Sequence, residues 1–128
     1  MDRELLRHAA RMALEGAGGS LQTLSLALVD DDRMRVLNHR YRAVDGPTDV
    51  IAFEAEDQPD GPAGEVIISV ATAVRQAREA GHALGRELCL LTVHGVLHVL
   101  GHDDTSAEGA ARMSALQEQI VADLEERL

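Results

Sequence analysis

The sequence is poor in aromatic residues, with one tyrosine, one phenylalanine and no tryptophan. Its 128 residues are 45% hydrophobic, which is enough apolar material to bury a core. That core must therefore consist mainly of leucine, valine, isoleucine and alanine. We expect a single compact domain over residues 1–128.

Cysteine and long apolar segments are equally scarce. The one cysteine, Cys89, cannot form an internal disulfide, and within ELCLLTV we interpret it as a buried hydrophobic residue without a catalytic role. No apolar run approaches the roughly 20 residues of a membrane span. The N-terminal residues alternate charged and apolar side chains, unlike a signal peptide. These absences predict a soluble, cytoplasmic protein with no membrane partner.

Lysine is absent, so all twelve basic residues are arginine, and the net charge is −10. An acidic chain does not bind nucleic acid indiscriminately, because such binding depends on clustered cations. A local basic site is still compatible with the sequence, since four arginines fall within ten positions: Arg33, Arg35, Arg40 and Arg42. On composition alone, this cluster is typical of a solvated helix face.

The hydrophobic pattern predicts an α+β fold, in which helices pack on a small mixed sheet. A helix is expected over residues 2–16, then a strand over 21–29 with Leu24, Leu26 and Leu28 on one face. The aspartates at 30–32 provide an N-cap for a helix that ends near Tyr41. Strands at VIAF and EVIISV flank a polar Pro/Gly loop at 56–64. Later helices are expected at 71–80, 85–100 and 106–127.

The segment HGVLHVLGHDD, residues 94–104, holds three of the six histidines. On a helix, His94 and His98 share one face with Cβ atoms about 6 Å apart, so both imidazoles can reach one metal ion. Gly101 predicts a left-handed helix end. The candidates for a third ligand follow it: His102, Asp103 and Asp104. Three protein ligands with an open fourth position are typical of a catalytic zinc site.

Two other metal chemistries have a similar pattern. The spacing H-x-x-x-H-x-x-G-x-x-D resembles the metzincin peptidase signature, in which a glutamate after the first histidine is the general base. Gly95 occupies that position, so no carboxylate there can take a proton from metal-bound water. A metallopeptidase is therefore disfavoured. Two histidines and a carboxylate also match the non-haem iron triad, but nothing else in the chain indicates an organic co-substrate.

Three segments in this order, NHRYRAVDGPTDVIAF, GEVIIS and HGVLHVLGHDD, resemble the YbeY family of bacterial ribosomal RNA maturation endoribonucleases. The resemblance extends from about Leu24 to the last helix. It implies a zincin-like fold with one zinc ion on a late helix and the loop after it. It also implies metal-dependent cleavage of single-stranded RNA in 16S ribosomal RNA 3′-end maturation and ribosome quality control, with the ribosome or ribosomal proteins as partners.

Carried over by position, the resemblance makes His94 and His98 zinc ligands and places Asp104 where the family usually has a third histidine. Helix geometry supports Asp104 over His102. Three histidines at four-residue intervals on an unbroken helix would spread over about 12 Å, which is too far for one ion. A helix that ends at Gly101 leaves Asp104 room to return towards the metal.

The resemblance also makes Arg42 the cation that acts on the RNA backbone. A planar guanidinium can hold a phosphate through two hydrogen bonds and stabilise charge in the transition state. Thr48 and Asp49 are interpreted as turn-capping residues outside the site. Met113 is interpreted as a core residue rather than as the methionine of a Met-turn beneath the metal. No general base is evident. A non-catalytic ribosome-assembly factor with a structural metal is the second alternative.

Overall fold

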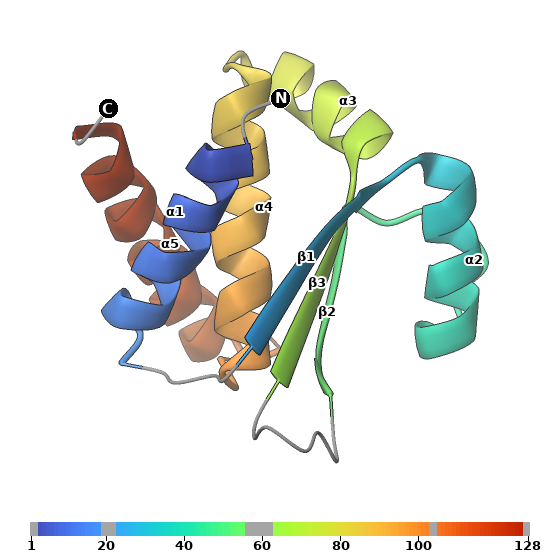
Figure 1. Cartoon of the computed structure of the whole chain (residues 1–128), viewed down its shortest axis with the longest axis horizontal. Coiled ribbons are helices and arrows are strands. Elements are labelled where there is room, and N and C mark those ends of the chain that lie inside the picture. The colour runs from blue at the N-terminus through green and yellow to red at the C-terminus, as the bar shows by residue number, and fades with distance from the viewer. Residues whose placement is uncertain (1–2, 19–22, 56–62, 103–104, 127–128) are drawn as a thin grey trace.

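The computed structural model describes residues 3–18, 23–55, 63–102 and 105–126 (Figure 1). Within these ranges the chain forms five helices and three strands, and the predicted α+β fold is confirmed. In chain order they are α1 (Arg3–Gly16), β1 (Thr23–Val29), α2 (Asp31–Arg42), β2 (Val50–Ala55), β3 (Ala63–Ser69), α3 (Val70–Ala80), α4 (Leu84–Val99) and α5 (Ala107–Glu126).

The three strands form a mixed sheet with the order β1-β3-β2, in which β3 is parallel to β1 and antiparallel to β2. The register aligns Leu26, Val66 and Ala52 across the sheet, so they lie on the same face. Leu24, Leu26 and Leu28 pack together against the main core, which confirms the predicted alternation in β1. The strand predicted at EVIISV begins slightly earlier, at Ala63.

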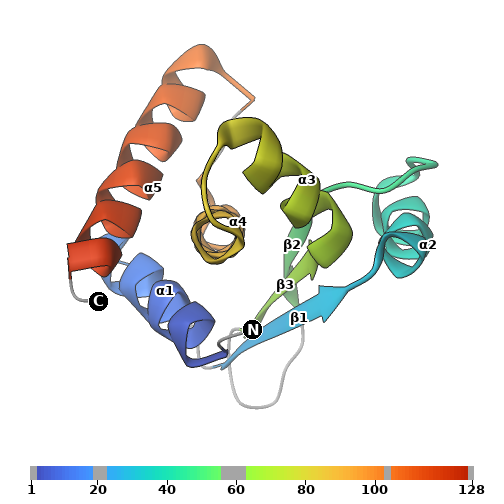
Figure 2. The same cartoon turned by 90° about the horizontal axis from the view of Figure 1, so that it is seen from above.

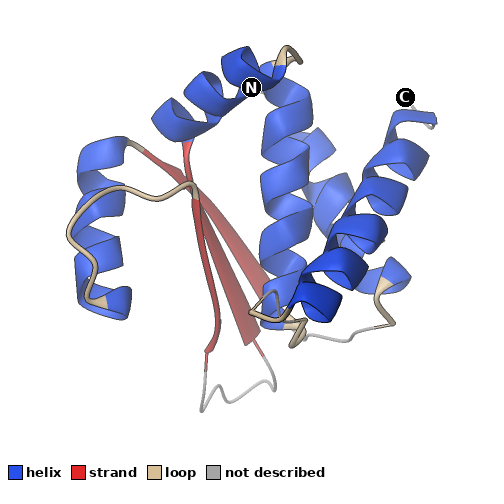
Figure 3. Ribbon diagram, turned by 180° about the vertical axis from the view of Figure 1, so that it is seen from behind, coloured by secondary structure: helices blue, strands red, loops and turns tan. Residues whose placement is uncertain are grey.

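Helices cover both faces of this sheet. α1, α4 and α5 lie on one side and α2 lies on the other (Figures 1 and 3). Figure 2 looks along α4 and shows it surrounded by α1, α3, α5 and the sheet, in agreement with its contacts to all of them. The main core lies around α4, and a smaller cluster of Met34, Leu37 and Ile51 lies beneath α2. None of the described helices has the length and apolar character needed to cross a membrane.

A glycine allows α4 to approach the sheet closely. A Cβ atom on Gly95 would lie 2.6 Å from Val66 Cγ1 and 3.3 Å from Val50 Cγ2. Such a contact with Val66 would violate van der Waals packing, so a side chain at this position requires the helix or the strand to move. Because His94 precedes Gly95, this contact also sets the distance between the histidines and strand β2.

α4 ends as the sequence predicted. Gly101 has a positive φ of 95°, and its N–H donates to the His98 carbonyl at 3.0 Å. The N–H of His102 donates to the Leu97 carbonyl at 3.0 Å, which closes the helix end in the manner of a Schellman motif. His102 therefore lies beyond the helix and does not continue the stripe of histidines. Cys89 and Met113 are both buried in the main core, as expected.

α2 is tied to the rest of the fold at its N-terminus. Asp31 accepts hydrogen bonds from Ser69 Oγ at 2.5 Å, Thr72 Oγ1 at 2.8 Å and the Arg75 guanidinium at 3.0 Å. These contacts, of which the Ser69 hydroxyl contributes most, lower the pKa of Asp31. Asp30 provides the predicted N-cap by accepting from Arg33 N at 2.7 Å. The network fixes α2 to the junction of β3 and α3.

The opposite end of α2 leads directly into the loop that precedes β2. The helix ends at Arg42, one residue past the predicted end, and Ala43 takes a left-handed conformation with a φ of 56°. Asn38 is buried in α2, and its Nδ2 donates to the Gly46 carbonyl at 2.8 Å. This hydrogen bond holds the loop against the helix, so the end of α2 and the start of β2 are positioned together.

Candidate functional site

A cleft of about 380 Å³ brings together side chains from α2, the loop after it, β2 and α4. It is lined by Arg42, Thr48, Asp49, Val50, Ala52, His94 and His98. Three of the four residues that the sequence predicted for the site therefore share one cleft, although they are far apart in the sequence. The fourth, Asp104, lies outside the described residues, so its role as a ligand stays a prediction.

The two histidines are the partly exposed positions in an otherwise buried part of α4, residues 91–99. Their Nε2 atoms are 3.1 Å apart, with ring centroids separated by 4.7 Å. Two nitrogen ligands of a tetrahedral zinc ion, each about 2.05 Å from the metal, stand roughly 3.3 Å apart. The two imidazoles thus converge as the four-residue spacing predicted, at a separation close to that of two ligands of one ion, and the binding of a metal stays a prediction.

A residue on α5 orients His94. Gln117 Oε1 lies 2.9 Å from His94 Nδ1, and in this orientation of the amide its oxygen accepts from a proton on Nδ1. In that tautomer the lone pair of Nε2 points towards His98. Metal-binding histidines typically have such a partner on the second ring nitrogen. Sequence reasoning missed Gln117 because nothing in the α5 sequence indicates which of its polar residues faces α4.

The described residues bring together two of the three predicted metal ligands, His94 and His98. Among them, no group of three histidine, cysteine, aspartate or glutamate side chains is arranged to hold an ion. His102 is described but does not line the cleft. The predicted third ligand, Asp104, is in the two-residue segment 103–104 that is not described, so the complete ligand set stays a prediction.

Arg42 is the cation of the cleft. Its neighbour Arg35 is neutralised by Asp45 through an ion pair of 2.9 Å. Arg42, by contrast, forms no ion pair with any carboxylate in the described part of the chain. A guanidinium exposed in a cleft and in no ion pair with a described residue is suited to bind an anionic group through two parallel hydrogen bonds.

Thr48 and Asp49 also line the cleft, although the sequence interpretation left them outside the site. Asp49 does perform the expected capping role, since Oδ1 accepts from Val50 N at 2.8 Å. Its Oδ2 accepts from Gln76 Nε2 at 3.3 Å, and its carbonyl accepts from Ser69 N at 2.9 Å. Asp49 is the one carboxylate that the described residues contribute to this cleft.

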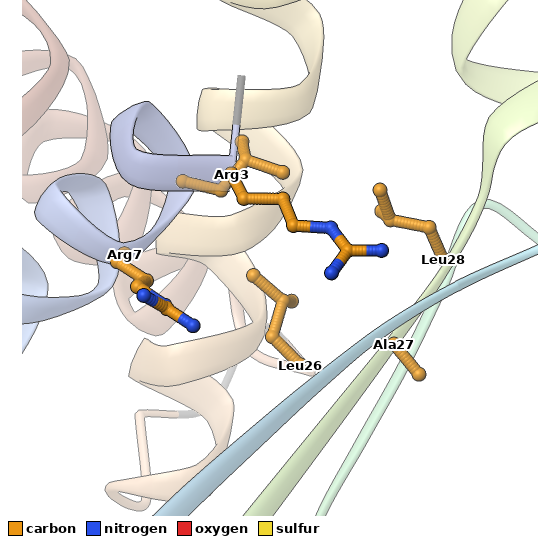
Figure 4. Close-up of a pocket in the computed structure, with 6 residues that line it drawn as sticks. Arg3, Arg7, Leu26, Ala27 and Leu28 are labelled. Carbon is orange, nitrogen blue, oxygen red and sulfur yellow. The ribbon is translucent and has the colours of Figure 1, made fainter. Parts of the chain in front are cut away.

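A second cleft, of about 410 Å³, lies between α1 and β1. Figure 4 shows Arg3 extending from α1 towards β1, where Leu26 and Leu28 point to the same side and Ala27 points away. Arg7, also on α1, is engaged with Glu4 at 2.8 Å. The described residues that line this cleft include no imidazole and no carboxylate, so its slightly larger volume does not make it a metal centre.

Fold and cleft together define a small α+β protein in which two converging imidazoles and an exposed guanidinium share one cleft. The family model for endoribonuclease YbeY matches residues 2–125. The chain belongs to this family, as the three sequence segments predicted.

Individual proteins support the assignment. The endoribonuclease YbeY of Moorella thermoacetica is 52% identical over 124 residues, covering 88% of this chain and 79% of that protein. The endoribonuclease YbeY of Symbiobacterium thermophilum is 44% identical, covering 94% of this chain and 85% of that protein. The solution structure of a Thermotoga maritima protein is similar in fold, with a TM-score of 0.67 and 26% identity over 97% of this chain and 83% of that one.

Proposed function

We propose that this chain is a zinc-dependent endoribonuclease that cleaves single-stranded RNA during 16S ribosomal RNA 3′-end maturation and ribosome quality control. Its enzyme class follows from its family, whose members are named endoribonucleases. The observation that carries the proposal is the cleft itself, which is lined by the His94 and His98 imidazoles and by the Arg42 guanidinium.

His94 and His98 would hold the zinc ion, with Asp104 as the proposed third ligand. When bound, zinc supplies Lewis-acid polarisation of a phosphate oxygen and a water molecule of lowered pKa. Gln117 keeps the proton of His94 on Nδ1 and so leaves Nε2 able to act as a ligand. His98 must likewise present its Nε2 lone pair, which requires the present contact between the two Nε2 atoms to open.

Arg42 would bind the scissile phosphate beside this centre. The net charge of −10 means that the protein as a whole repels RNA, so a local cation has to position the backbone. A guanidinium that holds two phosphate oxygens also stabilises the additional negative charge of the transition state. Arg42 sits at the end of a helix tied down at its other end by Asp31, so this cation is supported by a rigid element.

The metallopeptidase alternative is disfavoured by packing as well as by sequence. Gly95 occupies the position of the peptidase general base, and a side chain there would run into Val66 and Val50 rather than enter open space. A carboxylate at this position would be buried against the sheet without a partner, at a cost of several kcal/mol. The site therefore has no room for the group that peptide hydrolysis by this mechanism requires.

The test begins with metal analysis of protein purified without metal-chelate resin. Purified protein is then incubated with single-stranded RNA, duplex RNA and casein, each with and without chelator. The proposal predicts about one zinc ion per chain and chelator-sensitive cleavage of single-stranded RNA alone. Casein hydrolysis would favour the peptidase. Loss of cleavage only in variants that unfold would favour an assembly factor with a structural metal, and absence of both metal and cleavage would overturn the proposal.

A further inference from the structure

The only two aromatic residues of the chain lie against each other at the surface. Tyr41 on α2 and Phe53 on β2 are stacked with ring centroids 4.9 Å apart and an interplanar angle of 30°. Aromatic side chains usually contribute heavily to a core, yet here Tyr41 is 52% exposed. One face of its ring rests on Phe53, so the exposed area lies on the remaining face and edges. The pair forms a flat apolar platform open to solvent.

This aromatic platform, Tyr41 and Phe53, adjoins the cleft. Tyr41 immediately precedes Arg42, and Phe53 immediately follows Ala52, and both of these neighbours line the cleft. Side chains alternate along a strand, so Ala52 faces the α4 side of β2 while Phe53 faces the α2 side. β2 is at an edge of the sheet. A ligand chain that crosses this edge can therefore contact the platform and the cleft together.

The positive charge near the platform lies on its α2 side, whereas Glu65 on β3 is the cross-strand partner of Phe53. Arg40 and Arg42 flank Tyr41 in the sequence, and neither forms an ion pair with a described residue. An exposed aromatic ring between two arginines has the chemistry to contact a ligand that is both anionic and aromatic, in a chain whose net charge is −10. Single-stranded nucleic acid has this chemistry, because its phosphates bind cations and its unpaired bases stack on aromatic rings.

We propose that Tyr41, supported by Phe53, stacks on an unpaired base next to the phosphate bound by Arg42. The inference rests on the proposed function, because it takes the cleft as the site of RNA cleavage. A base within a duplex has both faces covered by its neighbours and cannot lie on the ring. Stacking on Tyr41 thus makes the cleft selective for single-stranded RNA without reading a particular sequence.

The unmodified protein carries its own reporter for this contact. With one tyrosine and no tryptophan, its ultraviolet emission comes from Tyr41 alone when the excitation wavelength lies beyond the absorption of phenylalanine. Single-stranded RNA of roughly eight nucleotides, a length within the usual site size, is expected to quench this emission as it binds. An abasic ribose-phosphate strand of the same length and an RNA duplex should leave the emission nearly unchanged, although both carry the same kind of charge.

Three variants separate the ring from the bulk of the side chain. Tyr41→Leu removes the ring and keeps an apolar side chain, and it should raise KM for single-stranded RNA about tenfold and reduce the preference over duplex. Tyr41→Phe keeps the ring and should behave like the parental protein. Val36→Ala is the matched control, since Val36 is on the same helix, is 54% exposed and does not line the cleft. Circular dichroism and thermal melting confirm folding.

The outcomes distinguish this inference from the proposed function. A folded Tyr41→Leu variant with parental KM and parental strand preference would overturn the stacking role. Absence of quenching by single-stranded RNA would overturn it as well, and would leave the exposed side chains of Val36, Tyr41 and Val44 as a surface for a protein partner. Quenching by RNA that the parental protein does not cleave would support the platform while refuting the cleavage activity.

Discussion

Substitution of Gly95 by alanine tests how the fold positions the two histidines. The added Cβ would lie 2.6 Å from Val66 Cγ1, 3.2 Å from Val66 Cγ2 and 3.3 Å from Val50 Cγ2. Val66 is fully buried on the central strand and β-branched, so its methyl groups cannot rotate out of the way. The strain must be relieved by movement of α4 away from the sheet.

Two opposing effects determine the change in stability. Alanine is a better helix former than glycine by about 1 kcal/mol in a helix interior. Overpacking of a filled core costs about 1–3 kcal/mol, and a 2.6 Å contact with a buried side chain belongs at the upper end of that range. We therefore expect Gly95→Ala to lower the free energy of unfolding by about 1–2 kcal/mol, the difference between these terms.

The effect on activity should exceed the effect on folding. A shift of α4 moves His94 and His98 relative to Arg42, and a misplacement of about 1 Å costs roughly 100-fold in rate. Urea unfolding and cleavage of single-stranded RNA by folded protein measure the two effects separately. Val66→Ala in the same chain removes the clashing methyl groups, so the double variant should cleave faster than Gly95→Ala alone.

Gly85→Ala is the matched control, because Gly85 lies in the same helix and its added Cβ would be 3.9 Å from Leu5 Cδ2. This ordinary contact should leave activity intact and stability unchanged or higher by up to about 1 kcal/mol. Parental stability and parental cleavage in Gly95→Ala would refute the view that a close helix–sheet contact positions the site.

Three further predictions concern the metal ligands and the anchoring of α2. Gln117→Leu should lower zinc affinity about 10–100-fold in a folded protein, measured by competition with a chromogenic chelator, because His94 loses the partner that fixes its tautomer; unchanged affinity would refute this role. Asp31→Asn should be less stable by about 1 kcal/mol at neutral pH. Folding lowers the pKa of Asp31, so its ionised carboxylate contributes its full stabilisation above the pKa of the unfolded chain, near 3.9. This stabilisation is lost as pH falls through the pKa of the folded protein, so the parental protein and Asp31→Asn should become equally stable in acid unfolding experiments. Asp104→Ala should lose most bound zinc and activity while His102→Ala keeps both, and the reverse result would reassign the third ligand.

The sequence predicted the parts of the fold that depend on local periodicity. The alternation of Leu24, Leu26 and Leu28 identified a face of β1, and the four-residue spacing of His94 and His98 identified convergent imidazoles. Each of these patterns is set within a single helix or strand. The same holds for the helix end at Gly101, where local backbone conformation suffices.

Contacts between distant elements could not be predicted in this way. Gln117 reaches His94 only because α5 packs against α4, and Asp49 enters the cleft only because the loop before β2 is held by α2. Tyr41 and Phe53 stack across the boundary between a helix and a strand. A single sequence does not specify how such elements are placed relative to one another, so the side chains that meet between them are known only from the folded structure.

Arg42→Ala asks whether the cleft acts on RNA through Arg42 beside His94 and His98. Zinc content, melting temperature and the rate of single-stranded RNA cleavage are measured on the same preparation. We expect zinc content and melting temperature to stay at parental values while cleavage falls by about tenfold or more, since an exposed arginine contributes little to folding and much to the stabilisation of transition-state charge. Arg42→Lys should recover part of the rate, because it keeps the charge without the planar fork. Cleavage by Arg42→Ala at the parental rate would contradict the account.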